Sequence, residues 1–179
     1  MIETERLALR PWREADKPRF RAIINTPAMM THFGGPTTDD ALDALIDAQI
    51  AGQRDDGFSM WAVDWRASGE PIGICGLRRA HHAGSPVFGM LEAGWRIAEA
   101  YWRRGVAREA AMASINWGWA HTDDAAIVAY TSPSNEPSWR LMQKLGMRRR
   151  TNLDFRHPRF AGDDPLGEMI VYAVERSAA

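Results

Sequence analysis

The turn Trp102-Arg103-Arg104-Gly105-Val106-Ala107 combines residue types that can hold an anion. Gly105 lets a loop backbone come close to a ligand, because it has no Cβ. The Ala-rich segment that follows is typical of a helix, whose first N–H groups are unpaired and lie at the positive end of its dipole. Arg103 and Arg104 add two cations. The turn therefore predicts a phosphate or pyrophosphate site, although the same residues also suit a plain strand–helix turn with two solvated arginines.

Two common phosphate-binding loops are absent from this turn. No Gly-Lys-Ser/Thr follows Gly105, as a P-loop requires. The Gly-x-Gly-x-x-Gly spacing of dinucleotide-binding folds is also missing. The turn is therefore neither of these loops.

The segments around the turn predict a βαβ unit. Four residues of one strand share a face with a two-residue period: Leu91, Ala93, Trp95 and Ile97. The helix after the turn is expected to run to about His121. Residues 125–131 then form a short apolar run of the kind that a buried parallel strand needs. Strand, basic turn, helix and buried strand make one βαβ unit.

The rest of the chain predicts a mixed α/β sheet with helices in a single domain spanning residues 1–179. Further strands are expected at residues 5–10, 58–65, 71–78, 148–155 and 168–174. Further helices are expected at residues 13–25, from 37 to just before Gly57, and at 136–145. Loops are expected at residues 26–36, 80–86 and 157–166.

Composition excludes several classes of function. The net charge of −1 provides no global basic field for nucleic acid. The single cysteine, Cys75, excludes an intrachain disulfide and a cysteine metal cluster, and its apolar neighbours predict a buried side chain rather than a nucleophile. The N-terminus is polar at once and no membrane-spanning run is found, so a cytoplasmic protein is expected.

The five histidines show no spacing typical of metal ligands. His81 and His82 are adjacent in a loop, so their side chains are expected to diverge and to lie at the surface. No bound metal is expected.

Two motifs resemble those of the GNAT N-acetyltransferases. Arg103-Arg-Gly-Val-Ala107 resembles their acetyl-coenzyme A (acetyl-CoA) pyrophosphate loop, whose usual pattern is Gln/Arg-x-x-Gly-x-Gly/Ala. Trp102 stands at the Gln/Arg position, as is typical of the branch that includes the ribosomal-protein N-terminal acetyltransferases. The segment 135–147 resembles the family's Asn-x-x-Ser/Ala…Lys-x-Gly-Phe helix. Two motifs in the right order are more specific than either alone, and the resemblance extends from Glu5 to Glu175.

The resemblance implies a fold and an activity. The fold would be a mixed, mostly antiparallel α/β sheet with a central splayed parallel pair, flanked by helices. The activity would be acetyl-CoA-dependent transfer of an acetyl group to a primary amine, on a protein N-terminus or a small molecule, by direct attack. No nucleic-acid or membrane partner is expected, and the protein would be a monomer or a homodimer. The implied cofactor-binding residues are Ile97, Ala98, Arg103, Arg104, Gly105, Val106, Ala107 and Asn135.

Acetyl transfer needs a base for the amine and an acid for the thiolate. Glu92 lies on the strand where family members often place their base, although it could equally be an ordinary glutamate on a polar face. Many relatives use a tyrosine as the acid, but Met142 stands at that position and cannot donate a proton. The resemblance leaves Ser138 as the acid, or else as a capping or groove-lining residue. Asn135 would bind the pantetheine arm or cap a helix, and His157 is a candidate on the acceptor side.

A second class of function stays open. A non-catalytic or catalytically weak CoA-binding module could keep the same fold. The missing tyrosine favours this alternative, whereas the presence of Glu92, Asn135 and Ser138 together disfavours it.

Overall fold

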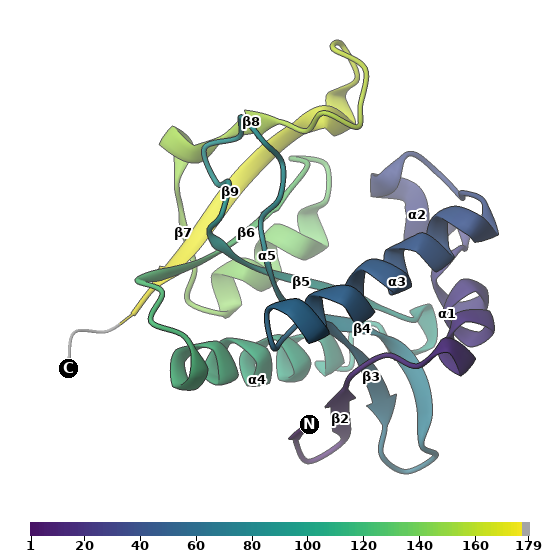
Figure 1. Cartoon of the computed structure of the whole chain (residues 1–179). Coiled ribbons are helices and arrows are strands. Elements are labelled where there is room, and N and C mark those ends of the chain that lie inside the picture. Colours follow the sequence, from purple (N-terminus) through teal and green to yellow (C-terminus); the bar gives the residue numbers. More distant parts are fainter. Residues whose placement is uncertain (177–179) are drawn as a thin grey trace. The chain divides into compact units, whose positions relative to one another are not determined.

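The computed structural model describes residues 1–176 (Figure 1). The chain forms two compact units. The first unit consists of residues 1–78 and 93–118, and the second of residues 79–92 and those from 119 onward. Three elements contribute residues to both units: β4 (Glu70–Arg79), whose last residue lies in the second unit, β5 (Leu91–Ile97) and α4 (Val106–His121). The single domain expected over residues 1–179 stays a prediction.

The first unit contains a sheet of neighbouring antiparallel strands. Their order is β1 (Ile2–Glu3), β2 (Leu7–Arg10), β3 (Met60–Trp65), β4 (Glu70–Arg79) and the main part of β5. The first four strands pair with antiparallel register. The expected strands in this region are confirmed. Strand β1 was not predicted, because two residues carry no recognisable period.

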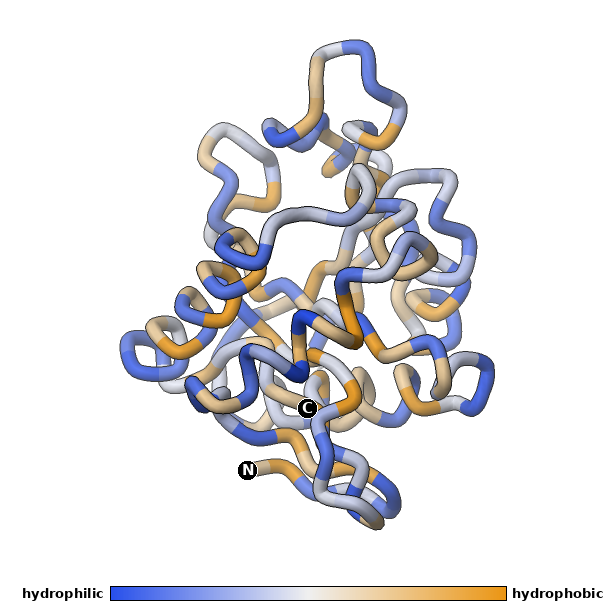
Figure 2. The backbone as a smooth tube through the Cα atoms, turned by 90° about the vertical axis from the view of Figure 1, so that its right-hand side faces the viewer, coloured by the Kyte–Doolittle hydropathy of each residue, from blue (hydrophilic) through white to orange (hydrophobic). Residues whose placement is uncertain are grey.

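The first unit contains several α-helices and 3-10 helices. They are η1 (Glu14–Asp16), α1 (Lys17–Ile24), α2 (Pro27–Met30), η2 (Thr31–Phe33), α3 (Asp39–Asp55), η3 (Glu99–Tyr101) and most of α4. The Thr38 hydroxyl accepts a hydrogen bond from the Ala41 N–H at the start of α3, as an N-cap should. Figure 2 shows hydrophobic and hydrophilic residues alternating along the helical turns, the pattern of helices with one buried face.

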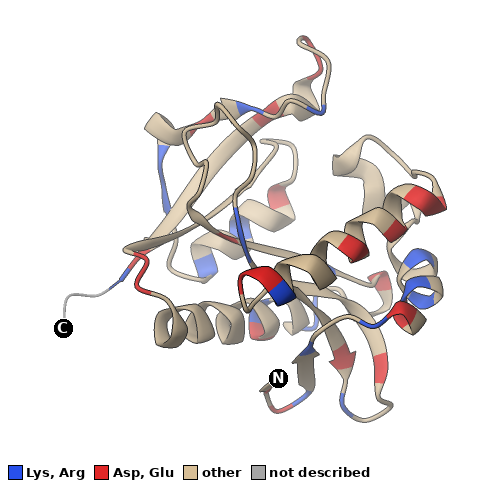
Figure 3. Ribbon diagram, viewed as in Figure 1, with Lys and Arg blue, Asp and Glu red and all other residues tan. Residues whose placement is uncertain are grey.

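Charge and apolar packing join α1 to α3. Phe20 and Ile24 of α1 and Leu42 and Ile46 of α3 are buried in one hydrophobic cluster. Lys and Arg residues of α1 also form ion pairs with acidic residues of α3, and Figure 3 colours the positions of these charged residues on the ribbon. Their ion pairs are Lys17–Asp47 at 2.6 Å and Arg21–Asp43 at 2.7 Å.

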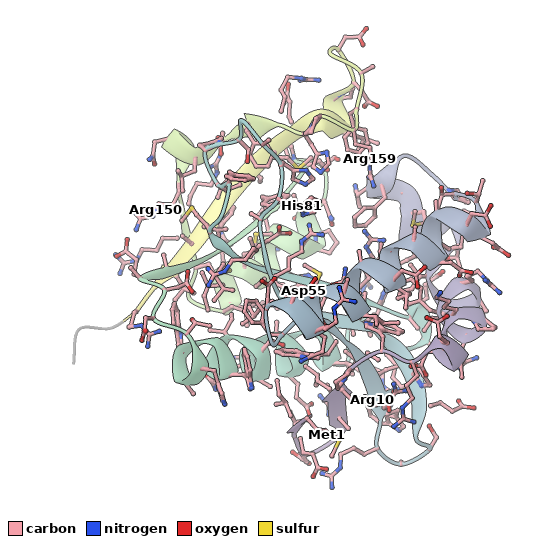
Figure 4. All side chains as sticks on the ribbon, viewed as in Figure 1. Met1, Arg10, Asp55, His81, Arg150 and Arg159 are labelled. Carbon is pink, nitrogen blue, oxygen red and sulfur yellow. The ribbon has the colours of Figure 1, made fainter. Side chains whose placement is uncertain are left out.

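A buried ion cluster holds the start of α1 against the sheet. The Arg10 guanidinium, labelled in Figure 4, donates to the carboxylates of Asp16 and Asp64. The shortest distances are 2.7 Å to Asp16 and 2.6 Å to Asp64. The hydrogen bond to Asp16 raises the pKa of Arg10 despite its burial. Arg10 and Asp16, whose pKa is lowered by the same hydrogen bond, are therefore both charged near neutral pH.

The second unit contains the parallel strand pair. It holds the first residues of β5, then β6 (Ala126–Thr131), β9 (Glu168–Glu175) and β7 (Arg148–Arg149), with β8 (Phe155–Arg156) also paired to β9. Strands β5 and β6 run parallel and pair only at Leu91↔Ile127 and Glu92↔Val128. Such short pairing is what a splayed parallel pair requires. The sheet thus has the mixed, mostly antiparallel form that the resemblance implies.

The second unit also contains short helices between its strands. Helix α5 spans Glu136–Lys144, and two 3-10 helices are η4 (Thr151–Leu153) and η5 (Pro165–Gly167). The buried hydrophobic cluster of the second unit includes Val87, Val128 and Val171. Helix α5 agrees with the helix predicted at residues 136–145 to within one residue.

Three expectations from the sequence were wrong in detail. Residues 26–36 are not all loop, because Thr26 accepts from the Met29 N–H and Pro27 starts helix α2. The helix expected at residues 13–25 begins as the 3-10 helix η1. The strand expected at residues 148–155 is interrupted by η4, because the Asp154 carboxylate accepts the hydrogen bond from the Val171 N–H that a strand backbone would otherwise accept.

Candidate active site

The basic turn has an unusual backbone in the first unit. Arg103 (φ 58°) and Gly105 (φ 76°) both lie in the left-handed region. A left-handed conformation is strained for arginine but not for glycine. The Trp102 indole N–H donates to the Ile97 carbonyl at 2.6 Å, which ties the turn to the end of β5. Val106 is buried at the first position of α4 and anchors the other end.

This geometry leaves a row of backbone donors without acceptors. The first hydrogen-bonded N–H of α4 is that of Glu109, which donates to the Gly105 carbonyl at 3.0 Å. Among residues 1–176, no group accepts from the N–H groups of residues 103–108. Unpaired donors at a helix N-terminus suit an anion. The predicted cofactor residues from Ile97 to Ala107 therefore come together around one donor-rich turn.

The cations of the turn differ in their surroundings. Arg103 is exposed, whereas the Arg104 guanidinium lies over the rings of Trp65 at 5.5 Å and Tyr101 at 5.3 Å. Arg108, in the first turn of α4, was not among the cofactor-binding residues expected from the sequence. It lines an open cavity of about 430 Å³ together with Arg6, Gly105, Glu109 and Met112. Its position three residues after Gly105 is the signal that would have found it.

Glu92 is a buried carboxylate in the second unit. Its side chain is on β5, the residue is 5% exposed, and its Oε2 accepts a hydrogen bond from the Tyr130 hydroxyl at 2.9 Å. Tyr130, on β6, was missed. It lies two residues beyond Val128, the partner of Glu92 in the parallel pairing, and so on the same face. Only the strand register reveals this, and the register is not readable from the sequence.

An aromatic and imidazole cluster surrounds Tyr130. The Tyr130 ring packs edge-on against Phe155 at 5.0 Å, and His82 lies 6.3 Å from it. His82 lies 4.1 Å from His157, measured between ring centroids. The His81 and His82 rings are 4.4 Å apart, so the expected divergence of these side chains was wrong (His81 is labelled in Figure 4). In the described part of the chain, no group of three or more His, Cys, Asp or Glu residues forms a metal site.

Asn135 and Ser138 lie together at the start of α5. Asn135 is the N-cap by position, but its amide N–H donates to the Thr131 hydroxyl at 2.9 Å and does not cap the helix. The Ser138 hydroxyl is half-buried and forms no hydrogen bond with any described residue. Met142 is buried and fills the core at the position where a tyrosine was expected in relatives. The two segments that carry the candidate catalytic groups are therefore β5 and α5.

Cys75 has no place in this chemistry. It is fully buried, with Sγ 3.7 Å from the Ser114 hydroxyl. Burial raises the pKa of its thiol to about 12. Cys75 is therefore a packed side chain, as its apolar neighbours predict.

The sequence profile of the Acetyltransferase (GNAT) domain matches residues 6–148. The chain belongs to the GNAT acetyltransferase family. The resemblance in the two motifs is thereby confirmed, and the protein is an N-acetyltransferase of a family that uses acetyl-CoA.

Relatives of this GNAT protein match most of its length. The uncharacterised N-acetyltransferase YoaA of Bacillus subtilis is 25% identical over 151 residues, which cover 83% of each chain. A crystal structure of an acetyltransferase from Agrobacterium tumefaciens is 29% identical, has a TM-score of 0.78, and covers 98% of this chain and 94% of its own. The ribosomal L7/L12 alpha-N-protein acetyltransferase RimL, solved with coenzyme A, is 14% identical with a TM-score of 0.74, covering 96% and 95%. This last similarity establishes the GNAT fold alone.

Within residues 1–176, no helix combines the length and the apolar composition needed to cross a membrane.

Proposed function

We propose that the protein transfers the acetyl group of acetyl-CoA to a primary amine by direct attack. One observation carries the cofactor half of the proposal: residues 103–108 present unpaired N–H groups at the start of α4, beside Arg103. A pyrophosphate needs such donors and cations. Ile97, Ala98, Arg103, Arg104, Gly105, Val106 and Ala107 are the proposed contacts in this part of the chain. Asn135 is the proposed contact of the pantetheine arm.

The reaction requires two proton transfers. The amine nitrogen attacks the thioester carbonyl carbon, and its proton goes to the Glu92 carboxylate, directly or through water. The C–S bond then breaks, and the leaving thiolate takes a proton from the Ser138 hydroxyl or from water. The burial of Glu92 and its hydrogen bond from Tyr130 support a carboxylate held in one orientation. Met142 cannot act as the acid because its thioether carries no proton.

The amine acceptor is proposed as a class. RimL acts on the N-terminus of a ribosomal protein, as its name states, and shares this fold. We propose either a protein N-terminus or a small primary amine as the acceptor. The protein acts as a monomer or a homodimer in this proposal, and the chemistry needs no metal.

Thioester consumption with a panel of N-terminal peptides and small amines tests the activity. We expect at least one acceptor to be acetylated at a rate above hydrolysis. Binding of acetyl-CoA without turnover across the whole panel would favour a catalytically weak CoA-binding module instead.

The Gly105→Glu variant tests the cofactor site. A carboxylate side chain at this left-handed position would strain the turn and repel a phosphate, so acetyl-CoA binding should be lost while the protein stays folded. Calorimetric titration measures the affinity, and circular dichroism checks the fold. Gly84→Glu is the matched control, because Gly84 (φ 82°) also has a positive φ and its Cβ would enter open space. Unchanged affinity in folded Gly105→Glu would remove the assignment of the turn.

A further inference from the structure

Arg6 lies between β1 and β2 and contacts the basic turn from the N-terminal segment. Its guanidinium donates to the Arg104 carbonyl at 3.0 Å and to the Glu109 carboxylate at 2.7 Å. Its backbone N–H donates to the other oxygen of the same carboxylate at 3.0 Å. One residue therefore binds both the middle of the turn and the first turn of α4.

Glu109 completes this arrangement. Its Oε1 also accepts from the Thr4 hydroxyl at 2.6 Å. Partial burial opposes ionisation, but the hydrogen bonds from Thr4 and from Arg6 outweigh it and lower the pKa of Glu109. Glu109 is therefore an anion that holds Arg6 in place and also suits the positive end of the helix dipole.

The contact with the Arg104 carbonyl has a geometric consequence. The peptide bonds of the described residues are all trans. In a trans peptide, the carbonyl of one residue and the N–H of the next point in opposite directions. Fixing the Arg104 carbonyl toward Arg6 therefore directs the Gly105 N–H away from Arg6. That N–H is one of the donors without an acceptor in the described chain.

The contacts of Arg6 can hold the turn in a strained backbone conformation. Arg103 adopts φ 58°, a conformation that an L-residue rarely keeps unless its surroundings impose it. The contacts of Arg6 with Arg104 and Glu109 span this part of the turn. Without them, the turn is free to relax into conformations that scatter its N–H groups.

We infer that Arg6, held by Glu109, is a positioning residue that aims the N–H groups of residues 103–108 at the cofactor phosphates. The inference rests on the proposed cofactor site. It assigns no phosphate contact to Arg6 itself. The N-terminal strand segment thereby controls cofactor affinity through the shape of the turn.

The decisive variant is Glu109→Gln. By charge alone, removing an anion beside a phosphate site strengthens phosphate binding. If Glu109 acts by holding Arg6, its removal weakens CoA binding instead. We expect the Kd for CoA, measured by calorimetry, to rise about fivefold or more. A Kd that falls or stays unchanged in Glu109→Gln would overturn the inference.

Variants of Arg6 separate position from charge. Arg6→Met should raise the Kd for CoA about five- to fiftyfold, the effect of losing charge-assisted hydrogen bonds. Arg6→Lys keeps the charge but loses the planar fork that reaches two acceptors, so its Kd should also rise. Parental affinity in Arg6→Lys would mean that Arg6 acts only as a charge. The kcat at saturating acetyl-CoA should stay parental in both variants, because the chemical step does not use Arg6.

Controls distinguish the inference from a purely structural effect and from failure of the proposed site. Arg19→Met and Glu70→Gln break an exposed ion pair of the same unit and should leave CoA affinity unchanged. A lower melting temperature of Arg6→Met with parental Kd would also overturn the inference. If Arg6→Met does not fold, Thr4→Val tests the same network more mildly, with a smaller rise in Kd. If Gly105→Glu loses CoA binding while the Arg6 and Glu109 variants keep the parental affinity, the inference about Arg6 is wrong. The proposed cofactor site is then still supported.

Discussion

At the scale of single residues, Glu92 and Tyr130 form the pair most relevant to the chemistry. If Glu92 takes the amine proton, Glu92→Gln should lower kcat by roughly 10²–10⁴-fold, the usual contribution of general-base catalysis. Tyr130→Phe removes the hydroxyl that orients the carboxylate but keeps the ring packed on Phe155. It should lower kcat by about tenfold. Steady-state kinetics at saturating substrates measures both effects.

The buried Tyr172 of β9 provides a matched control for Tyr130. Its hydroxyl forms no hydrogen bond with any described residue, so Tyr172→Phe should keep the parental kcat. Ser138→Ala should reduce kcat more mildly than Glu92→Gln, because water can replace a hydroxyl as the proton donor. Affinity for acetyl-CoA should change little in Glu92→Gln. A Glu92→Gln enzyme with near-parental kcat would make Glu92 a structural residue and reduce catalysis to the positioning of two substrates.

At the scale of elements, the ion cluster of Arg10 fixes how α1 and β3 meet β2. Arg10→Met leaves Asp16 and Asp64 buried without their cation. Breaking a buried ion pair in this way costs about 3–5 kcal/mol. We therefore expect the free energy of unfolding of Arg10→Met, measured in urea, to fall by about that amount.

The cause of this loss can be tested within the same cluster. Adding Asp16→Asn and Asp64→Asn to Arg10→Met removes the two uncompensated charges and should restore part of the stability. Arg54→Met breaks an exposed pair with Asp55 on α3 and should change stability little. A loss in Arg10→Met no larger than that in Arg54→Met would show that the cluster contributes little.

At the scale of the whole molecule, both units depend on ionised carboxyl groups. In the first unit, the pKa values of Asp16 and Glu109 are lowered: partial burial opposes ionisation, but hydrogen bonds from their partners outweigh it. In the second unit, the pKa values of Asp124 and Asp154 are lowered, mainly by hydrogen bonds from Arg79 and Arg149. The folded protein therefore binds fewer protons than the unfolded chain in acid. The stability from these groups is complete above their ordinary pKa values and is lost as pH falls through the lowered ones.

We expect the free energy of unfolding to fall below about pH 5, by about 1.4 kcal/mol per pH unit for each extra proton that the unfolded chain binds. We also propose that the two units unfold together as one domain, because β5 and α4 run through both. Urea unfolding followed by tryptophan fluorescence and circular dichroism at a series of pH values tests both expectations. Stability that is flat from pH 6 to 3 would contradict the first, and two separate transitions would contradict the second.

Local patterns were sufficient to predict the basic turn and most elements. The N–H groups at the start of α4 are unpaired because of where the helix begins, and the glycine in the preceding turn marks that point. Thr38 likewise predicts the start of α3 through a contact three residues away. Such features depend on neighbouring residues alone. For the same reason, the two motifs at residues 103–107 and 135–147 were together enough to suggest the family to which the chain belongs.

The partners of the candidate site residues depend on contacts distant in the sequence. Tyr130 reaches Glu92 only because the parallel register sets Val128 opposite Glu92. Arg6 meets Glu109 across 103 positions of the chain. His82 and His157 become neighbours only when their two loops fold. The composition and periodicity of the sequence show which residues share a face of a helix or strand. Which faces come into contact depends on strand register and packing, and these are defined only in the folded chain.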